Sequence, residues 1–157
     1  MIRLASALLS LIFVPTAFPQ LAAKKALTLD AVKAMAAAAE SQAKKNNLRV
    51  AMAIVDDGGH LLYFERMDGV HAGAVQVAQR KAESAAIYRR PGKAFADRVA
   101  AEPQVVMLPG AFPFEGGFPI VIEGEVIGAI GISGATSAQD AEIAQAALAA
   151  LAKLAKK

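Results

Sequence analysis

Residues 50–66 read VAMAIVDDGGHLLYFER, and this stretch decides the fold. Residues 50–55 form a continuous apolar run of strand length, and residues 56–59 are the Asp and Gly types that favour a tight turn. Residues 60–66 then alternate, which places successive side chains on opposite faces of a second strand. The pattern predicts a β-hairpin.

A second hairpin is predicted nearer the C-terminus. Residues 118–122 have the composition of a strand, Glu123 and Gly124 form a tight turn, and residues 125–133 supply the partner strand. Because Pro and Gly are frequent in residues 103–117, we expect a long loop there with a functional or interface role.

Apolar residues recur at helical spacing in the rest of the chain. Thr28 is placed to cap the first helix, and Ser137 to cap the last, with Asp140 in its first turn. The predicted helices cover residues 29–46, 72–89, 93–101 and 138–154. The order of elements indicates an α+β fold in a single domain, with helices packed on a mainly antiparallel sheet.

The composition excludes several classes of protein. The chain has 157 residues, of which 55% are hydrophobic but only 6% aromatic, because 37 of them are alanine. This length supports one domain, and the 20% of charged residues argue against a disordered chain or a protein with several membrane spans. The net charge of +3 is dispersed, so we expect no nucleic-acid partner. Without cysteine, disulfides, thiolate nucleophiles and iron–sulfur ligation are excluded.

The N-terminus has the pattern of a secretory signal peptide. Arg3 precedes an apolar run from Leu4 to Val14, which is too short to span a bilayer comfortably. We predict a signal peptide at residues 1–23 and a mature domain at residues 24–157, in the periplasm or secreted, with no stable membrane insertion after cleavage. The alternative is an uncleaved N-terminal anchor.

The glycines at positions 128, 131 and 134 lie within a predicted strand. The dinucleotide signature requires instead a strand, a turn and a helix of a parallel βαβ unit, so these glycines do not match it. We expect them to allow a bulge or the close approach of a helix or another subunit. The alternative is a flat ligand lying against the backbone.

His60 and His71 are the only histidines, which limits the metal chemistry open to the chain. A catalytic zinc would need both of them and a carboxylate such as Glu65, Asp68 or Glu115. A haem iron needs only one axial imidazole, and either histidine is sufficient. Less favoured axial ligands are Met67 and Tyr63. No Gly-x-Ser-x-Gly elbow is present, and no catalytic residue is assigned.

Five segments in order resemble the GlcG/HbpS family, which is related to the C-terminal domain of PduO-type cobalamin adenosyltransferases. The resemblance covers about residues 27–152, which is essentially the whole predicted mature chain. The five segments are residues 53–61, 64–69, 78–85, 116–120 and 127–134.

The resemblance implies a profilin-like antiparallel sheet flanked by helices. It also implies a homo-oligomer, and haem as the cofactor, because several members bind haem. One secreted member partners a sensor kinase in redox signalling, so a sensor protein is a further expected partner. Other members lie in operons for small-molecule catabolism. Members of the family do not share one obvious axial position, so the resemblance assigns no haem ligand in this chain.

The favoured hypothesis is an exported haem- or tetrapyrrole-binding protein in haem handling or redox sensing, more consistent with a binding protein than with an enzyme. His60 is the predicted metal ligand. Phe112, Phe114, Phe118 and Ile120 would form an apolar slot for the porphyrin. Arg66, Arg80 or Lys81 would pair with its propionates. The predicted cofactor-binding residues are His60, Arg66, Met67, His71, Phe114 and Phe118, with Phe112 also in the slot.

Two other hypotheses remain open. In one, the protein binds or transforms an organic acid, with Arg66 pairing with a carboxylate and Glu65, Asp68 or His60 acting as acid or base. In the other, it is a structural oligomer or a signalling partner without a catalytic role.

Overall fold

The computed structural model describes residues 22–155, so almost all of the predicted leader at residues 1–23 lies outside the described part. Every predicted helix and strand is present, with ends that differ by one or two residues. The elements are α1 (Leu29–Lys45), β1 (Ala51–Asp56), β2 (Leu61–Arg66), α2 (Gly73–Ile87), α3 (Gly92–Val99), the 3₁₀ helix η1 (Pro103–Met107), β3 (Gly117–Ile122), β4 (Glu125–Ser133) and α4 (Ser137–Leu154).

The four strands form one antiparallel sheet in the order β2-β1-β4-β3. Each predicted hairpin is present, and the two hairpins join through β1 and β4, where Ala51 pairs with Ser133 and Ile54 with Ile130. The two strands with the longest apolar runs are therefore central, and β2 and β3 are the edges. This confirms the α+β class with an antiparallel sheet.

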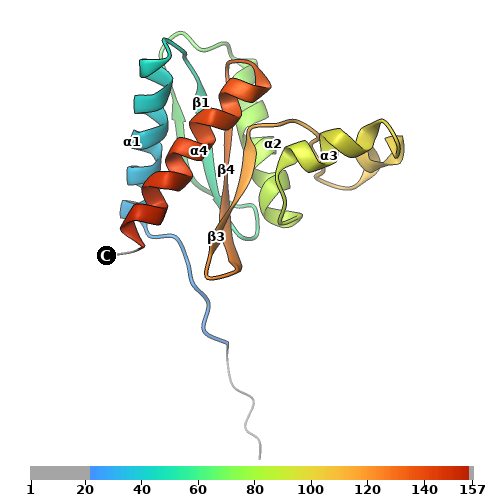
Figure 1. Cartoon of the computed structure of the whole chain (residues 1–157), viewed down its shortest axis with the longest axis horizontal. Coiled ribbons are helices and arrows are strands. Elements are labelled where there is room, and N and C mark those ends of the chain that lie inside the picture. The colour runs from blue at the N-terminus through green and yellow to red at the C-terminus, as the bar shows by residue number, and fades with distance from the viewer. Residues whose placement is uncertain (1–21, 156–157) are drawn as a thin grey trace, which may run out of the picture.

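Helices cover both faces of the sheet (Figure 1). On one face, α1 and α4 pack against each other and enclose a core of large side chains, among them Met35, Ile54 and Ile143. On the other face α2 packs on β1 and β4 through a core that is almost entirely alanine, such as Ala53 and Ala78. The alanine content thus reflects close packing of helix on sheet.

Gly131 shows how close that packing is. A Cβ atom at this position would lie 2.1 Å from the carbonyl oxygen of Ala78 and 2.5 Å from the backbone nitrogen of Ala82, both on α2. No side chain fits between the strand and the helix here. Of the two interpretations of this glycine, the structure supports the approach of a helix and not a flat ligand.

The caps of the long helices follow from local hydrogen bonds. Thr28 caps α1 as predicted, and its hydroxyl accepts from the N–H of Ala31. The predicted cap of α4 was wrong by one residue: Thr136 is the cap, and it forms a reciprocal capping box with Gln139. Because Ser137 is already helical, Asp140 lies one position beyond the capping box and its carboxylate serves another purpose.

The segment from α3 to β3 projects from the body as an arm (Figure 1). The predicted long loop contains η1, and the side chains of Val106, Met107 and Phe114 are exposed on the arm. Tyr88 holds the base of the arm, because its ring packs edge-on against Phe95 and its hydroxyl donates to the carbonyl of Pro109. Within residues 22–155, no helix has the length and apolar character needed to cross a membrane.

Candidate functional site

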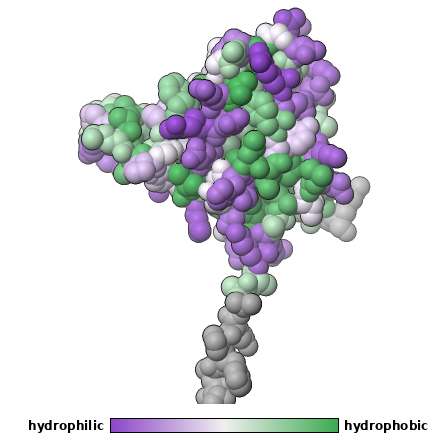
Figure 2. All heavy atoms as spheres, turned by 180° about the vertical axis from the view of Figure 1, so that it is seen from behind, coloured by the Kyte–Doolittle hydropathy of each residue, from purple (hydrophilic) through white to green (hydrophobic). Residues whose placement is uncertain are grey.

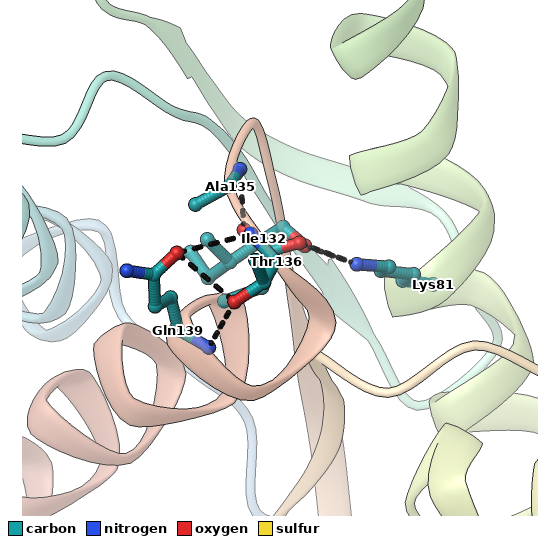
Figure 3. A network of polar contacts seen from close by, with 6 residues as sticks. Lys81, Ile132, Ala135, Thr136 and Gln139 are labelled. Atoms are coloured by element: carbon teal, nitrogen blue, oxygen red, sulfur yellow. Dashed lines mark hydrogen bonds and ion pairs between the residues drawn. The ribbon is translucent and has the colours of Figure 1, made fainter.

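A buried ion pair joins the two helical layers at one end of the sheet. The Lys81 ammonium lies 2.8 Å from Oδ2 of Asp140 and also donates to the carbonyl of Ile132 at 2.9 Å. The other carboxylate oxygen of Asp140 accepts from the N–H of Ala135. Figure 3 shows Lys81 reaching from α2 toward the loop that precedes α4. Gly116 makes room for the pair, since a Cβ there would lie 2.9 Å from Nζ of Lys81.

This pair removes Lys81 from the candidates for a haem propionate. Its side chain is 3% exposed and its partner's 2%, so neither faces solvent. Burial raises the pKa of Asp140, and the hydrogen bond and charge of Lys81 offset this only in part. The ammonium of Lys81 and both carboxylate oxygens of Asp140 have hydrogen-bond partners within the protein. Buried charges need such partners if they are not to destabilise the fold. The pair is structural.

His60 lies at the tip of the first hairpin and is oriented by Asp56. Oδ1 of Asp56 accepts from the N–H groups of Gly58 and His60, both at 2.9 Å, and lies 3.3 Å from Nδ1 of the His60 ring. Burial acts to raise the pKa of Asp56, but these hydrogen bonds and the adjacent imidazole hold it below its ordinary value. The turn predicted from Asp and Gly thus also positions an imidazole.

The hydrogen bond to Asp56 assigns the tautomer of His60. A carboxylate only accepts, so Nδ1 carries a proton, and in the neutral ring Nε2 then has a free lone pair. Metal-binding imidazoles are usually oriented by such a hydrogen bond from their other ring nitrogen, to a carboxylate, a backbone carbonyl or water. The side chain of His60 is 83% exposed, and therefore Nε2 is accessible to a ligand from solvent.

Apolar side chains and Glu83 of α2 lie beside this turn. Leu61 and Leu62 follow His60 and are about half exposed, and Ile87 of α2 is 40% exposed. Ile87 lies directly against the turn, because a Cβ on Gly59 would be 3.2 Å from its Cγ2. On the face shown in Figure 2, hydrophobic residues gather in patches between hydrophilic ones.

A hollow of about 590 Å³ borders the other side of the same turn. Its wall includes Asp57, the exposed Arg89 and two lysines, of which Lys24 pairs with Asp57 at 2.6 Å. The turn that carries His60 therefore has apolar side chains on one side and, on the other, a hollow lined by charged side chains of both signs.

Arg66, Met67 and His71 lie at the opposite end of β2. They line two adjoining hollows of about 360 and 310 Å³, with the Arg49 side chain forming part of both walls. The Arg66 guanidinium donates to the carbonyl of Val70 and so ties down the loop between β2 and α2.

His71 has the tautomer opposite to that of His60. Its Nδ1 lies 3.2 Å from the backbone nitrogen of Ala74, which donates. Nδ1 is therefore the acceptor, and the proton of the neutral ring resides on Nε2. The accessible nitrogen of His71 is a hydrogen-bond donor and not a ready metal ligand.

The predicted residues therefore do not form one site. At a strand rise of 3.3 Å per residue, β2 places about 20 Å between His60 and Arg66, and His71 lies beyond Arg66 at that end of the strand. This separation excludes a zinc site that uses both. No cluster of three or more His, Cys, Asp or Glu in residues 22–155 could hold a metal ion.

The predicted aromatic slot is also divided. Phe112 and Phe114 stack at 4.8 Å on the arm, where the Arg80 guanidinium lies over the Phe112 ring. Phe118 packs instead against the core under α1 and α4, and Ile120 is fully buried in that core. These side chains face different layers because the sheet separates them.

The pairing of Asp56 with His60 and the place of Arg49 in a site were not predicted from the sequence. A carboxylate four residues before a histidine across a tight turn is a signal that could have identified Asp56 as the partner of His60. Arg49 precedes a strand and matches no motif, so only the folded chain brings it beside His71.

The chain matches the family described as "Haem degrading protein HbpS-like" over residues 27–149. It belongs to the HbpS-like family. A relative is the protein GlcG of Escherichia coli K12, which is 42% identical over 109 residues that cover 69% of this chain and 81% of GlcG.

Two solved structures have the same fold as this chain. HbpS of Streptomyces reticuli, in a doubly substituted form, superposes with a TM-score of 0.78 at 32% identity, over 87% of this chain and 95% of that one. A PduOC:haem complex superposes with a TM-score of 0.74 at 27% identity, over 80% and 95%. The family and fold predicted from the sequence are thus confirmed.

Proposed function

We propose that this protein binds haem and that Nε2 of His60 is the axial ligand of the iron. Membership of the HbpS-like family and the likeness to the PduOC:haem complex support the cofactor. The observation that carries the choice of ligand is the Asp56–His60 hydrogen bond, which leaves Nε2 free on an exposed, apolar surface. When bound, the group would supply the redox chemistry of its iron.

The surface around His60 fits an amphipathic porphyrin. Leu61, Leu62 and Ile87 offer apolar contact for the ring, and Arg89 beyond the turn offers a cation for a propionate. His71 lacks these properties, since its Nε2 carries a proton and its surroundings are polar. Arg66 is close to His71 and would not reach a porphyrin on His60.

The test is a haemin titration of the purified protein, followed through the Soret band. We expect wild type, His71→Ala and Met67→Ala to give the same shifted band, and His60→Ala to lose it while circular dichroism shows an unchanged fold. A His60→Ala protein with the wild-type spectrum would overturn the assignment of the ligand. Absence of any shift at micromolar haemin in wild type would overturn haem binding itself.

The proposed setting is outside the cytoplasm, in haem handling or redox sensing with a sensor protein, and as a homo-oligomer. The pattern of residues 1–23 supports export, and the exposed apolar side chains of Val106 and Met107 on the arm support self-association. N-terminal sequencing of protein from cell fractions tests export, and light scattering of the purified chain tests the oligomer. An uncleaved cytoplasmic chain, or a monomer at all concentrations, would contradict these two proposals.

A further inference from the structure

The 360 Å³ hollow beside His71 is a second concave site, at the end of β2 opposite His60. Its wall is formed by Asn47, Leu48, Arg49, Gly69, Val70, His71 and Gly134. Because β2 places about 20 Å between His60 and Arg66, the hollow lies beyond the reach of one porphyrin bound at His60. A molecule bound in this hollow would therefore be separate from a porphyrin on His60.

The charged and titratable groups on this wall can only donate hydrogen bonds or carry positive charge. Arg49 supplies the guanidinium N–H groups, and His71 supplies Nε2–H because its Nδ1 already accepts from Ala74. No carboxylate is part of the wall. Among residues 22–155, no acidic side chain lies within ion-pair distance of Arg49, and its guanidinium makes no hydrogen bond there.

The adjoining 310 Å³ hollow makes a useful contrast. Its cations are matched by acidic groups: Lys44 pairs with Glu40 at 2.7 Å, and Glu65 and Asp68 lie in the same wall. Arg49 lines both hollows. In the 310 Å³ hollow its positive charge is accompanied by carboxylates, and in the 360 Å³ hollow the wall has no carboxylate. Only the hollow beside His71 has an excess of donors.

The backbone fixes the position of these donors. The guanidinium of Arg49 lies against Gly69, where a Cβ would be 2.9 Å from Nη1, and the positive φ of 79° also favours glycine there. Gly134 lies against the carbonyl of Arg49, where a Cβ would be 2.4 Å away. The next residue, Ala135, is held by the buried carboxylate of Asp140. Two glycines and a buried ion pair thus shape the hollow.

We propose that this hollow binds a small organic carboxylate, held by the guanidinium of Arg49 and by Nε2–H of His71. The planar fork of arginine matches a carboxylate through two parallel hydrogen bonds. The volume admits a short mono- or dicarboxylic acid. Inorganic phosphate shares the oxyanion chemistry and is a separate arm of the test.

The experiment is calorimetric titration of the purified full chain with acetate, succinate and inorganic phosphate, each at the same ionic strength. We expect binding of a carboxylate to wild type and a loss of at least tenfold in affinity for Arg49→Gln, since a hydrogen bond to a charged group contributes about 1.5–3 kcal/mol. His71→Ala should also weaken binding, and Arg49→Lys should give an intermediate affinity. Lys33→Gln, which removes an exposed cation on α1, is the matched charge control and should bind within about twofold of wild type.

Three outcomes would overturn the proposal. The first is that wild type shows no heat of binding with acetate or succinate at fixed ionic strength. The second is that wild type and Arg49→Gln bind the carboxylate with equal affinity. The third is that only phosphate binds. The haem spectrum separates this site from the proposed function. Arg49→Gln should keep the Soret shift while it loses the carboxylate, and His60→Ala should do the reverse.

Discussion

Lys81 on α2 and Asp140 on α4 form an ion pair between helices that cover opposite faces of the sheet. Nζ of Lys81 lies 2.8 Å from Oδ2 of Asp140, and both side chains are almost fully buried. The pair passes the end of the sheet beside Gly116, where no side chain intervenes. It therefore connects the alanine-rich layer with the layer of large side chains.

We expect Asp140→Ala to destabilise the protein by about 3–5 kcal/mol, because it leaves the buried ammonium of Lys81 with only the carbonyl of Ile132 and no opposite charge. The free energy of unfolding from urea denaturation measures this. The double variant Lys81→Met with Asp140→Leu should recover most of the loss, since apolar residues of similar volume leave no charge behind.

The exposed pair of Lys93 and Asp97 is the matched control. Nζ of Lys93 lies 2.7 Å from Oδ1 of Asp97, but both side chains are more than half exposed. Asp97→Ala should therefore change stability much less than Asp140→Ala does. Equal effects of Asp97→Ala and Asp140→Ala would show that burial does not set the energy of the inner pair.

Gly131→Ala should be among the most destabilising single-methyl additions in the chain. The new Cβ would lie 2.1 Å from the Ala78 carbonyl oxygen, which belongs to the backbone of α2 and cannot rotate away. Overpacking of this kind costs about 1–3 kcal/mol or more. Gly73→Ala is the control, because its Cβ would make only ordinary contacts with the His71 ring, 3.4 Å away. A thermal midpoint for Gly131→Ala equal to that of Gly73→Ala would contradict this account of α2 packing.

The hairpins, helices and alanine layer could be predicted because their signals are local. Alternation, Asp-Gly turns and helical spacing depend on residues within a few positions of each other. The cap of α4 was misplaced because Thr136 and Ser137 are both good caps, and the reciprocal bond to Gln139 decides between them.

The sites could not be assembled from the sequence in the same way. Arg49 and His71 are distant along the chain, and Lys81 meets Asp140 across 59 positions, so only the folded chain brings each pair together. Among the predicted cofactor residues, His60 and Arg66 lie at opposite ends of β2. Phe114 lies on the arm, whereas Phe118 packs against the core under α1 and α4. No periodicity in the sequence reports such distances.

The hydrogen bonds to Asp56 predict a specific loss of stability in acid. They hold its pKa below the ordinary value of 3.8, so the unfolded chain takes up the proton at a higher pH than the folded chain does. The stabilisation is complete well above pH 3.8 and is lost as the pH falls through the lower pKa of the folded state. Urea denaturation from pH 6 to pH 2.5 should show a steeper loss for wild type than for Asp56→Asn. Parallel curves would contradict the assignment.

Gly58→Ala should weaken haem binding without weakening the fold. Gly58 is exposed and has an ordinary backbone conformation, so the methyl group costs little by itself. Its Cβ, however, would lie 2.9 Å from Nδ1 of His60, so the ring must turn away from Asp56. The imidazole then loses the hydrogen bond that fixes its tautomer, and loss of such a partner typically costs about 10–100-fold in metal affinity.

Haemin titration and thermal denaturation of the same Gly58→Ala sample test this directly. Gly73→Ala serves as the control, since it adds a methyl group near His71, the histidine that we do not assign to the iron. We expect Gly58→Ala to weaken haemin binding at an almost unchanged thermal midpoint, and Gly73→Ala to change neither. If Gly58→Ala bound haemin as wild type does, the orientation of His60 by Asp56 would have no part in ligation. The imidazole would then act, if at all, without a fixed tautomer.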